Sequence, residues 1–348
     1  IGRNLAYGFD RMHTWMALAH AQIPVDFVSE DQAAAGGLDG YRVCYFSGPN
    51  LTRAAAAKLA DWVQAGGTLI ATAGAGARDE YNRPLETVEG VLSAVRGELA
   101  TLQSHQSSGH YLSVLLPKGR VVDRATGAGI DVLSVFQPLT PREGAVVVAT
   151  NTAGVAAWVR GGHGAGTVHA LGFLPALDYI RQALVARQAR VEQAKSETAA
   201  EAAIDGPDAS KEAGAAAGTL LTAEDRRRIE TSANPWAFPA SVRDALLAPA
   251  RAAGIRPPVI CSEPLVDAVY MTGDEGIVIP LANYTLLPLP RVEFSVRVPQ
   301  VPQRVESVHR GALDYRLETA NGEQRIVFAL PLDSTDYLAI RWRASPLR

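Results

Sequence analysis

Two short apolar runs on either side of one helix-length segment constrain the first half of the chain more than any other feature. The runs are Tyr41 to Ser47 and Thr68 to Thr72, and Leu51 to Ala65 between them has helical periodicity and ends at Gly66-Gly67. A glycine pair commonly ends a helix, because glycine adopts positive φ without strain. Strands that are apolar along their whole length are typical of a sheet covered on both faces. We therefore expect an open, mostly parallel α/β sheet with helices on both faces.

The residues before the first run extend the same alternation. Arg11 to Gln22 reads as a helix, with Met12, Trp15, Met16 and Ala19 on one face, and the apolar segment Ile23 to Val28 reads as a strand. Strand and helix signals in this order predict a flavodoxin-like or amidotransferase-like sheet.

Three parts follow from the changes in pattern along the chain. Short β-runs and a hairpin over residues 155–173 close an α/β domain that we place at residues 1–181. Residues 182–257 form an Ala-rich flexible insert and then a docked helix, in which Trp236, Phe238, Val242, Leu246 and Leu247 restore helical periodicity. Residues 258–348 contain evenly spaced short strands and the turn signal Asn321-Gly322, which predict a C-terminal β-sandwich.

Charge and composition exclude several classes of function. The net charge is -3 and the pI is about 6.2, so the chain offers no basic field for nucleic acid or an anionic membrane surface. Two cysteines, Cys44 and Cys261, are too few for a disulfide framework or a zinc site. No histidine spacing indicates a metal site, and we expect no cofactor. The chain begins at Ile1, which we do not take for the biological N-terminus.

The glycine-rich turn after Thr72 is the first candidate for chemistry. Gly74 and Gly76 lack the third glycine of a dinucleotide-binding fingerprint, and Asp79-Glu80 would repel a pyrophosphate. A hydrolase nucleophile in this fold would stand here, yet Thr72 is the only hydroxyl between Ile70 and Ala77. We therefore assign no catalytic residue to the chain.

The densest polar cluster of the turn is Arg78, Asp79, Glu80 and Asn82. Open α/β sheets bind ligands at the carboxyl ends of their strands, so these residues are candidates for ligand or subunit contact. The alternative is a solvated loop whose acidic residues cap a helix that starts near Leu85.

The run LDGYRVCYFSGPNLTRAAAAKLADWVQAGGTLIATAGAGARDEYN, residues 38–82, resembles the β-galactosidase trimerisation domain of glycoside hydrolase family 42. The similar features are the VDFV segment, a strand that reaches a proline, the W-V-x-x-G-G-T-L block and the G-x-x-D-E-x-N loop. The later G-x-G-T-V-H-A-L-G-F-L-P resembles the closing hairpin of that domain, and the C-terminal strands resemble the β-sandwich tails of such hydrolases.

This resemblance implies a non-catalytic accessory or oligomerisation portion of a β-galactosidase-like protein. Its chemistry would lie in a (β/α)8 barrel that this chain does not contain, and its partners would be sibling subunits or that barrel. The alternative is a sugar-binding or sugar-processing amidotransferase-like domain that uses the loop at residues 78–82, with carbohydrate as its ligand. A purely structural interaction module is a third reading. We expect a soluble protein, and secretion or a periplasmic location of the full-length parent is left open.

Overall fold

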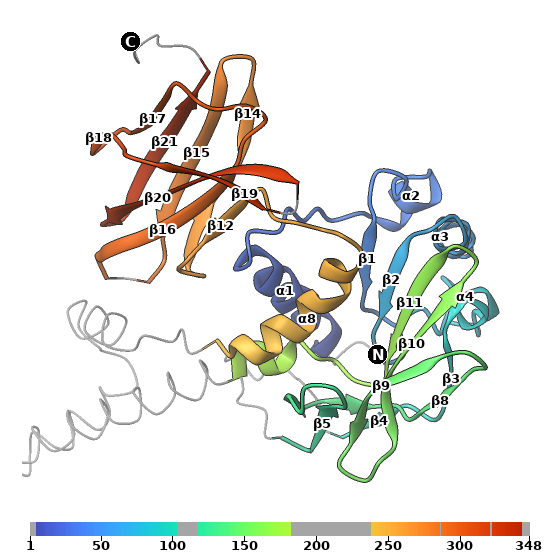
Figure 1. Cartoon of the computed structure of the whole chain (residues 1–348). Helices are drawn as coiled ribbons and strands as arrows, with labels where there is room; N and C mark the ends of the chain where they lie inside the picture. The colour runs from blue at the N-terminus through green and yellow to red at the C-terminus, as the bar shows by residue number, and fades with distance from the viewer. Residues whose placement is uncertain (1–4, 103–116, 182–237, 286, 321, 343–348) are drawn as a thin grey trace, which may run out of the picture.

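The computed structural model describes residues 5–102, 117–181, 238–285, 287–320 and 322–342. Figure 1 shows an α/β region, coloured blue to green, beside an all-β region, coloured orange to red. The helix α8, Ala240–Ala252, lies in the space between them and against the α/β region.

The α/β region contains the elements predicted around its first two strands. Its helices are α1 Ala6–Ala19, α2 Glu30–Ala34, α3 Arg53–Gln64 and α4 Glu86–Val91. Its strands are β1 Val43–Phe46, β2 Thr68–Ala71, β3 Ala94–Arg96, β4 Ala100–Thr101, β5 Gly119–Asp123, β6 Gly129–Val132, β7 Val135–Phe136, β8 Leu139–Pro141, β9 Val146–Asn151, β10 Ala156–His163 and β11 Gly166–Leu171. Thr52 caps the start of α3, and Gly66 with a φ of 125° follows its end, as the glycine pair predicts.

The seven-stranded sheet is mixed, so the prediction of a mostly parallel sheet is wrong. Its order is β1-β2-β11-β10-β9-β5-β6. Only β1 with β2 and β2 with β11 pair in parallel, and the four remaining pairings are antiparallel. The predicted hairpin is the reason: β10 and β11 are joined by a tight turn, which forces antiparallel pairing, and β11 then lies beside β2.

Helices cover both faces of this sheet, as the sequence predicts. Successive residues of a strand point to opposite faces, and the two cores follow that alternation. Leu69 packs with Leu59 and Val63 of α3 on one face. Ile70 packs on the other face, in the cluster that contains Ala17 of α1 and Leu246 of α8. The docked helix expected after the insert is therefore α8, whereas Trp236 lies outside the described residues.

Two local predictions near the N-terminus differ from the structure. Met12 and Trp15 are each 41% exposed, because α1 buries the face of Ala6, Asp10, His13, Thr14, Ala17 and Leu18 instead. Residues 23–28 do not form a strand, since no described strand pairs with them.

The all-β region has two packed sheets, β12-β16-β20-β19 and a second sheet of β13, β14, β15, β21, β17 and β18. The strands are β12 Val259–Cys261, β13 Val266–Ala268, β14 Met271–Gly273, β15 Gly276–Asn283, β16 Leu289–Arg297, β17 Arg304–Ser307, β18 Gly311–Ala312, β19 Arg316–Ala320, β20 Glu323–Leu332 and β21 Thr335–Arg341. One apolar cluster that includes Ile279, Phe294, Phe328 and Ile340 joins the two sheets. Ala320 faces Glu323 across the predicted turn, so the hairpin is confirmed.

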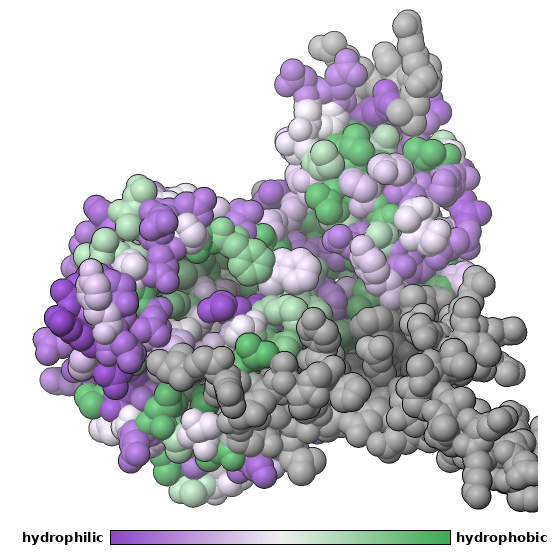
Figure 2. Space-filling model, turned by 180° about the vertical axis from the view of Figure 1, so that it is seen from behind, coloured by the Kyte–Doolittle hydropathy of each residue, from purple (hydrophilic) through white to green (hydrophobic). Residues whose placement is uncertain are grey.

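Gln22 connects the two regions at the end of α1. Its side chain donates to the carbonyl of Val266 over 2.6 Å and accepts from the amide of Ala268 over 3.2 Å. Seen from behind in Figure 2, hydrophobic residues line a hollow in the α/β region, near its border with the β-sandwich at the upper right.

Candidate functional site

The turn that carries the polar cluster is fixed by two glycines with positive φ. A Cβ on Gly76 would lie 2.9 Å from the Phe46 ring, and one on Gly74 would lie 2.9 Å from the Tyr7 hydroxyl. Their amides are already used, since Gly74 donates to Gln137 Oε1 over 2.8 Å and Gly76 donates to Gly48 O over 2.9 Å. The turn therefore serves close packing, and these amides are not available to a phosphate group.

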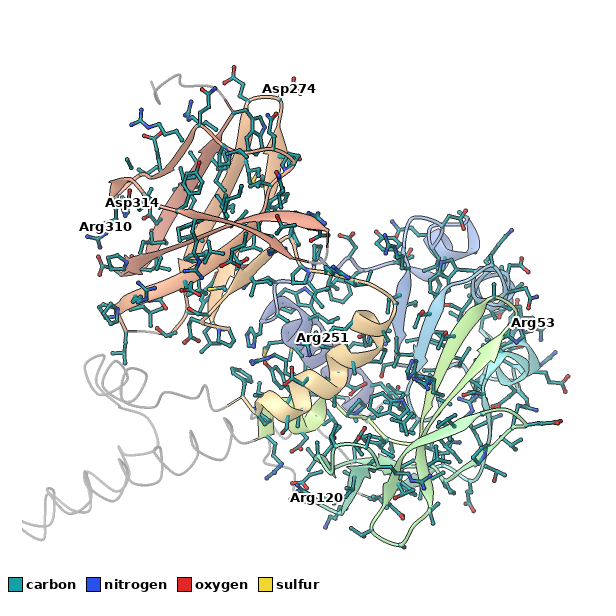
Figure 3. The ribbon with its side chains drawn as sticks, viewed as in Figure 1. Arg53, Arg120, Arg251, Asp274, Arg310 and Asp314 are labelled. Atoms are coloured by element: carbon teal, nitrogen blue, oxygen red, sulfur yellow. The ribbon has the colours of Figure 1, made fainter. Side chains whose placement is uncertain are left out.

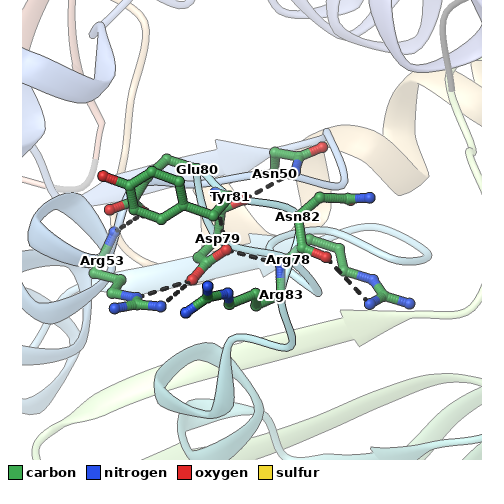
Figure 4. Close-up of polar contacts among 8 residues, drawn as sticks. All are labelled: Asn50, Arg53, Arg78, Asp79, Glu80, Tyr81, Asn82 and Arg83. Atoms are coloured by element: carbon green, nitrogen blue, oxygen red, sulfur yellow. Dashed lines mark hydrogen bonds and ion pairs between the residues drawn. The ribbon is translucent and has the colours of Figure 1, made fainter.

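Asp79 organises the loop that follows. Its Oδ1 accepts from the amides of Tyr81 and Arg83 over 2.9 and 2.8 Å, and its Oδ2 accepts from Nε and Nη2 of Arg53 over 2.8 and 2.5 Å (Figure 4). Burial would raise the pKa of this carboxyl, but the bonds from Arg83, Arg53 and Tyr81 outweigh it and hold the pKa below its usual value. Asp79 thus shapes the loop, and both oxygens are occupied.

The other members of the cluster are exposed around Asp79. Glu80 accepts from the amide of Arg53 over 3.0 Å, and Arg78 donates to the carbonyl of Asn82 over 3.4 Å. Asn82 has a φ of 62°, which places it in the left-handed region where asparagine is tolerated. The structure therefore brings Arg78, Asp79, Glu80 and Asn82 together in one compact loop, as their adjacency requires.

The expectation that the acidic residues cap the helix near Leu85 is wrong. No side chain caps α4 at Leu85, whereas Glu80 accepts an amide in the first turn of α3. A carboxylate at that position is favoured by the positive end of the helix dipole. The bond from the Arg53 amide to Glu80 therefore holds the loop against the first turn of α3.

Tyr81 is the residue of this loop that the sequence reasoning missed. Its side chain is 69% exposed, and the guanidinium carbons of Arg53 and Arg83 lie 5.9 and 6.0 Å from its ring centroid. A large exposed aromatic ring beside arginines is typical of the residues that dominate protein interfaces. The sequence feature that could have identified Tyr81 is an aromatic residue directly after Asp79-Glu80 in an otherwise polar loop.

A second polar cluster lies at the carboxyl ends of β1 and β2. Thr72 Oγ1 donates to Ser47 Oγ over 3.1 Å, and Ser47 Oγ donates to Asp10 Oδ2 over 2.8 Å. Asp10 is fully buried, and this burial raises its pKa to about 7 despite the bonds from Ser47 and the Ala176 amide. Sequence reasoning did not identify Asp10, because it lies on α1, distant along the chain from Ser47 and Thr72.

Ser47 is bonded to the carboxyl of Asp10, and no histidine or cysteine bonds to either hydroxyl in the described parts of the chain. His169 lies on β11 and accepts from the Trp158 indole over 3.1 Å, and burial lowers its pKa to about 4. Burial also raises the pKa of the Cys44 thiol to about 12, which is the reverse of what a nucleophilic cysteine needs. Neither histidine nor cysteine completes a catalytic arrangement with Ser47 or Thr72.

Asp131 and Asp178 are two further buried carboxylates, and both pair with the guanidinium of Arg181. Arg181 Nη2 lies 2.6 Å from Asp131 Oδ2, and its Nε lies 2.9 Å from Asp178 Oδ1. The exposed side chain of Arg120 also pairs with Asp131, and its Nη1 lies 2.9 Å from Asp131 Oδ1. These pairs are consistent with a structural role, since a glycosidase pair must face a bond between its two carboxyl groups.

No group of three potential metal ligands occurs in the described parts of the chain, and none of the helices described there is long and apolar enough to cross a membrane.

A mixed α/β sheet that is followed by a β-sandwich defines the class of this chain, and comparison with known proteins gives its family. The family model described as beta-galactosidase trimerisation domain matches residues 3–193. Because this match spans more than half of the chain, the protein belongs to that family.

Solved structures share the fold at low sequence identity. A beta-galactosidase from Bacillus circulans sp. alkalophilus has a TM-score of 0.58 at 14% identity, covering 96% of this chain and 37% of its own. A beta-galactosidase from Rahnella sp. R3 has a TM-score of 0.55 at 15% identity, covering 95% and 36%. Alpha-L-fucosidase isoenzyme 2 from Paenibacillus thiaminolyticus has a TM-score of 0.55 at 11% identity, covering 96% and 45%.

The chain thus spans less than half the length of each of these structures. At this identity the likeness shows the fold alone. No sequence among the curated proteins matches the chain significantly.

Proposed function

We propose that this chain is an accessory, oligomerisation portion of a β-galactosidase-like glycoside hydrolase and is catalytically silent by itself. The observation that carries the proposal is the family match over residues 3–193. The coverage of 36–37% of the two beta-galactosidases supports a catalytic part that lies elsewhere in the parent protein. The partners would be sibling subunits or a (β/α)8 catalytic domain.

The proposal includes three structural units, namely an α/β domain at residues 1–181, the insert and docked helix at 182–257, and the sandwich at 258–348. A finer relation of the first unit to flavodoxins or amidotransferases stays a prediction. The separate apolar clusters of the first and third units support this division.

Within this function, the loop of residues 78–83 would be a subunit contact. Arg78, Glu80 and Asn82 are exposed, and Asp79 holds the backbone that presents Tyr81. Arg53, which is bonded to Asp79, lies on the side of the α/β region away from the sandwich (Figure 3). A sibling subunit could therefore reach the loop without meeting the sandwich of the same chain. Preformed loop geometry supports this role, because little ordering entropy is lost on association.

Light scattering during size-exclusion chromatography tests the contact. We expect the 348-residue chain to associate with increasing concentration, and Tyr81→Ala to weaken association about tenfold or more, as loss of an interface hot spot does. Tyr284→Ala is the matched control, since Tyr284 is an exposed tyrosine of the sandwich. Equal association of both variants and the parent chain would remove the loop from the proposal.

The sugar-binding alternative predicts a different result from the same variants. Hydrogen exchange of the loop amides at millimolar galactose or lactose would show protection that Tyr81→Ala abolishes. An assay with an aryl β-galactoside tests catalytic silence, and turnover that persists through purification would overturn it.

A further inference from the structure

Two aromatic rings are the most exposed large hydrophobic side chains in the described parts of the chain. Phe27 is 70% exposed and Tyr81 is 69% exposed, and Leu287 follows at 60%. Single exposed apolar residues are common on protein surfaces, but aromatic rings are the side chains that most often dominate subunit contacts. A surface that carries both rings is therefore a candidate for such a contact.

The start of α3 brings the segments of the two rings together. The Thr52 amide donates to Glu30 Oε2 over 2.8 Å, and the next amide, of Arg53, donates to Glu80 Oε2 over 3.0 Å. Glu30 follows the first ring by three residues and begins α2, whereas Glu80 directly precedes the second ring. Figure 1 shows α2 beside α3 in the α/β region. Because consecutive residues are only about 3.8 Å apart, the two segments meet at this helix end.

The surface around Phe27 is acidic. We call it the acidic half and define it by the exposed residues Asp26, Phe27, Glu30 and Asp31. Residues 12–41 contain no lysine or arginine. The acidic half therefore surrounds one apolar ring with carboxylates and brings no positive charge of its own segment.

The backbone on both sides of Phe27 is held in place by side-chain bonds. Asp26 Oδ2 accepts from the Tyr41 hydroxyl over 2.9 Å. Ser29 and Gln32 form a capping box at the start of α2, with bonds of 2.8 and 3.2 Å. A ring that is presented by ordered backbone loses little conformational entropy on association. The acidic half is thus preformed, as is the loop that carries the second ring.

The surface around Tyr81 is basic. We call it the basic half and define it by the exposed residues Arg53, Arg78, Tyr81 and Arg83. The guanidinium carbons of Arg53 and Arg83 lie 5.9 and 6.0 Å from the ring centroid. The loop also contains two carboxylates, but three guanidiniums leave the basic half with a net positive charge. The two halves therefore have opposite charge and each presents one aromatic ring.

We propose that the acidic half of one copy of this chain packs against the basic half of a second copy. The inference rests on the proposed oligomerisation and names the surface that the loop at residues 78–83 contacts. Phe27 would lie against a guanidinium of the basic half, which combines apolar burial with a cation–π contact. The carboxylates around it would face the arginines, and this complementarity steers the two copies together.

The charges also decide which surfaces meet. Two acidic halves repel each other, as do two basic halves, so only the contact of unlike halves is favourable. Each copy presents both halves side by side at the start of α3. The same contact can therefore repeat from subunit to subunit under a rotation and close into a ring.

Reversing one charge in each half tests the contact in the whole 348-residue chain. Asp31→Arg and Arg83→Asp each place like charges against each other, whereas the double variant restores opposite charges with their order exchanged. We expect light scattering to show association weakened about tenfold in each single variant and mostly recovered in the double variant. Phe27→Ala should weaken association about tenfold as well. Raising NaCl from about 0.05 M to about 0.5 M should weaken association of the parent chain.

The matched control is Asp274→Arg, because Asp274 is exposed at the end of the sandwich away from Arg53 (Figure 3). It should associate like the parent chain. Circular dichroism confirms that each variant folds. If a charge reversal unfolds the chain, the neutral changes Asp31→Asn and Arg83→Gln should give losses of about threefold in the same assay.

Two outcomes would overturn the pairing of the halves. One is a double variant that associates as weakly as the single variants. The other is unchanged association of Phe27→Ala and Asp31→Arg while Tyr81→Ala weakens it, since the loop would then contact a different surface and the proposed function would stand. A parent chain that stays monomeric at every concentration would overturn the proposed function together with this inference.

Discussion

In the β-sandwich one continuous apolar cluster lies between two sheets, whereas the α/β region divides its core among four clusters. The α/β region also sets buried titratable groups, such as Asp10 and His169, next to those clusters. A continuous apolar core needs little beyond hydrophobic burial to be stable. A divided core depends more on polar contacts, such as the hydrogen bonds of Asp10 and His169. We therefore expect the two regions to respond differently to substitution and to pH.

The largest effect is expected from Phe294→Ala in the sandwich. Phe294 is fully buried and stacks on Phe328 at 5.8 Å between ring centroids. Deleting the ring should cost about 3–5 kcal/mol of unfolding free energy. Hydrogen exchange should show lost protection in β15 and β20 and little change in β2 and β11. Val278→Ala, at a position 45% exposed, should stay within about 0.5 kcal/mol. Equal losses in both regions would show that they unfold as one unit.

A pH effect should be confined to the α/β region and should disappear in Asp10→Asn. The folded pKa of Asp10 is about 7 against an ordinary value of 3.8, so between about pH 4 and pH 7 the folded state keeps a proton that the unfolded chain has lost. The unfolding free energy should therefore fall as pH rises through this window, by up to about 4 kcal/mol, and level off above it. Asparagine keeps the hydrogen-bonding shape without titrating. Urea titrations at pH 5, 6, 7 and 8 measure the difference.

The matched control for that experiment is Asp39→Asn, at an exposed position. It should keep the pH dependence of the parent chain. Parallel pH profiles for the parent chain and Asp10→Asn would refute the assignment of this effect to Asp10.

A smaller effect is expected at the contact between the two regions. Gln22→Ala removes both bonds to the backbone of Val266 and Ala268, which should cost about 1–3 kcal/mol if those groups stay buried. Gln22 has a φ of 57°, so Gln22→Gly loses the same bonds but relieves the strained backbone and should be less destabilising than alanine. Differential scanning calorimetry of both variants would separate the two contributions. A sandwich transition that neither variant moves would show that the regions are not coupled here.

Local sequence determined much of this architecture. The apolar runs around Cys44 and Ile70, the helix between them and the hairpin of residues 155–173 are all present, because each is specified by neighbouring residues. The strands of the sandwich follow for the same reason. The location of the polar loop at residues 78–82 was also visible, since adjacent residues cannot be separated by folding.

Only the tertiary structure decided how these pieces combine. The hairpin could be predicted, but the pairing of β11 with β2, which makes the sheet mixed, depends on contacts between residues almost a hundred positions apart. Residues 23–28 have the composition of a strand yet lack a partner, because a strand is stable only when a neighbour completes its ladder. The same holds for the sites. Asp79 and Asp10 read as ordinary carboxylates in the sequence. The bonds from Arg83 and Arg53 keep the carboxyl of Asp79 charged, whereas burial raises the pKa of Asp10.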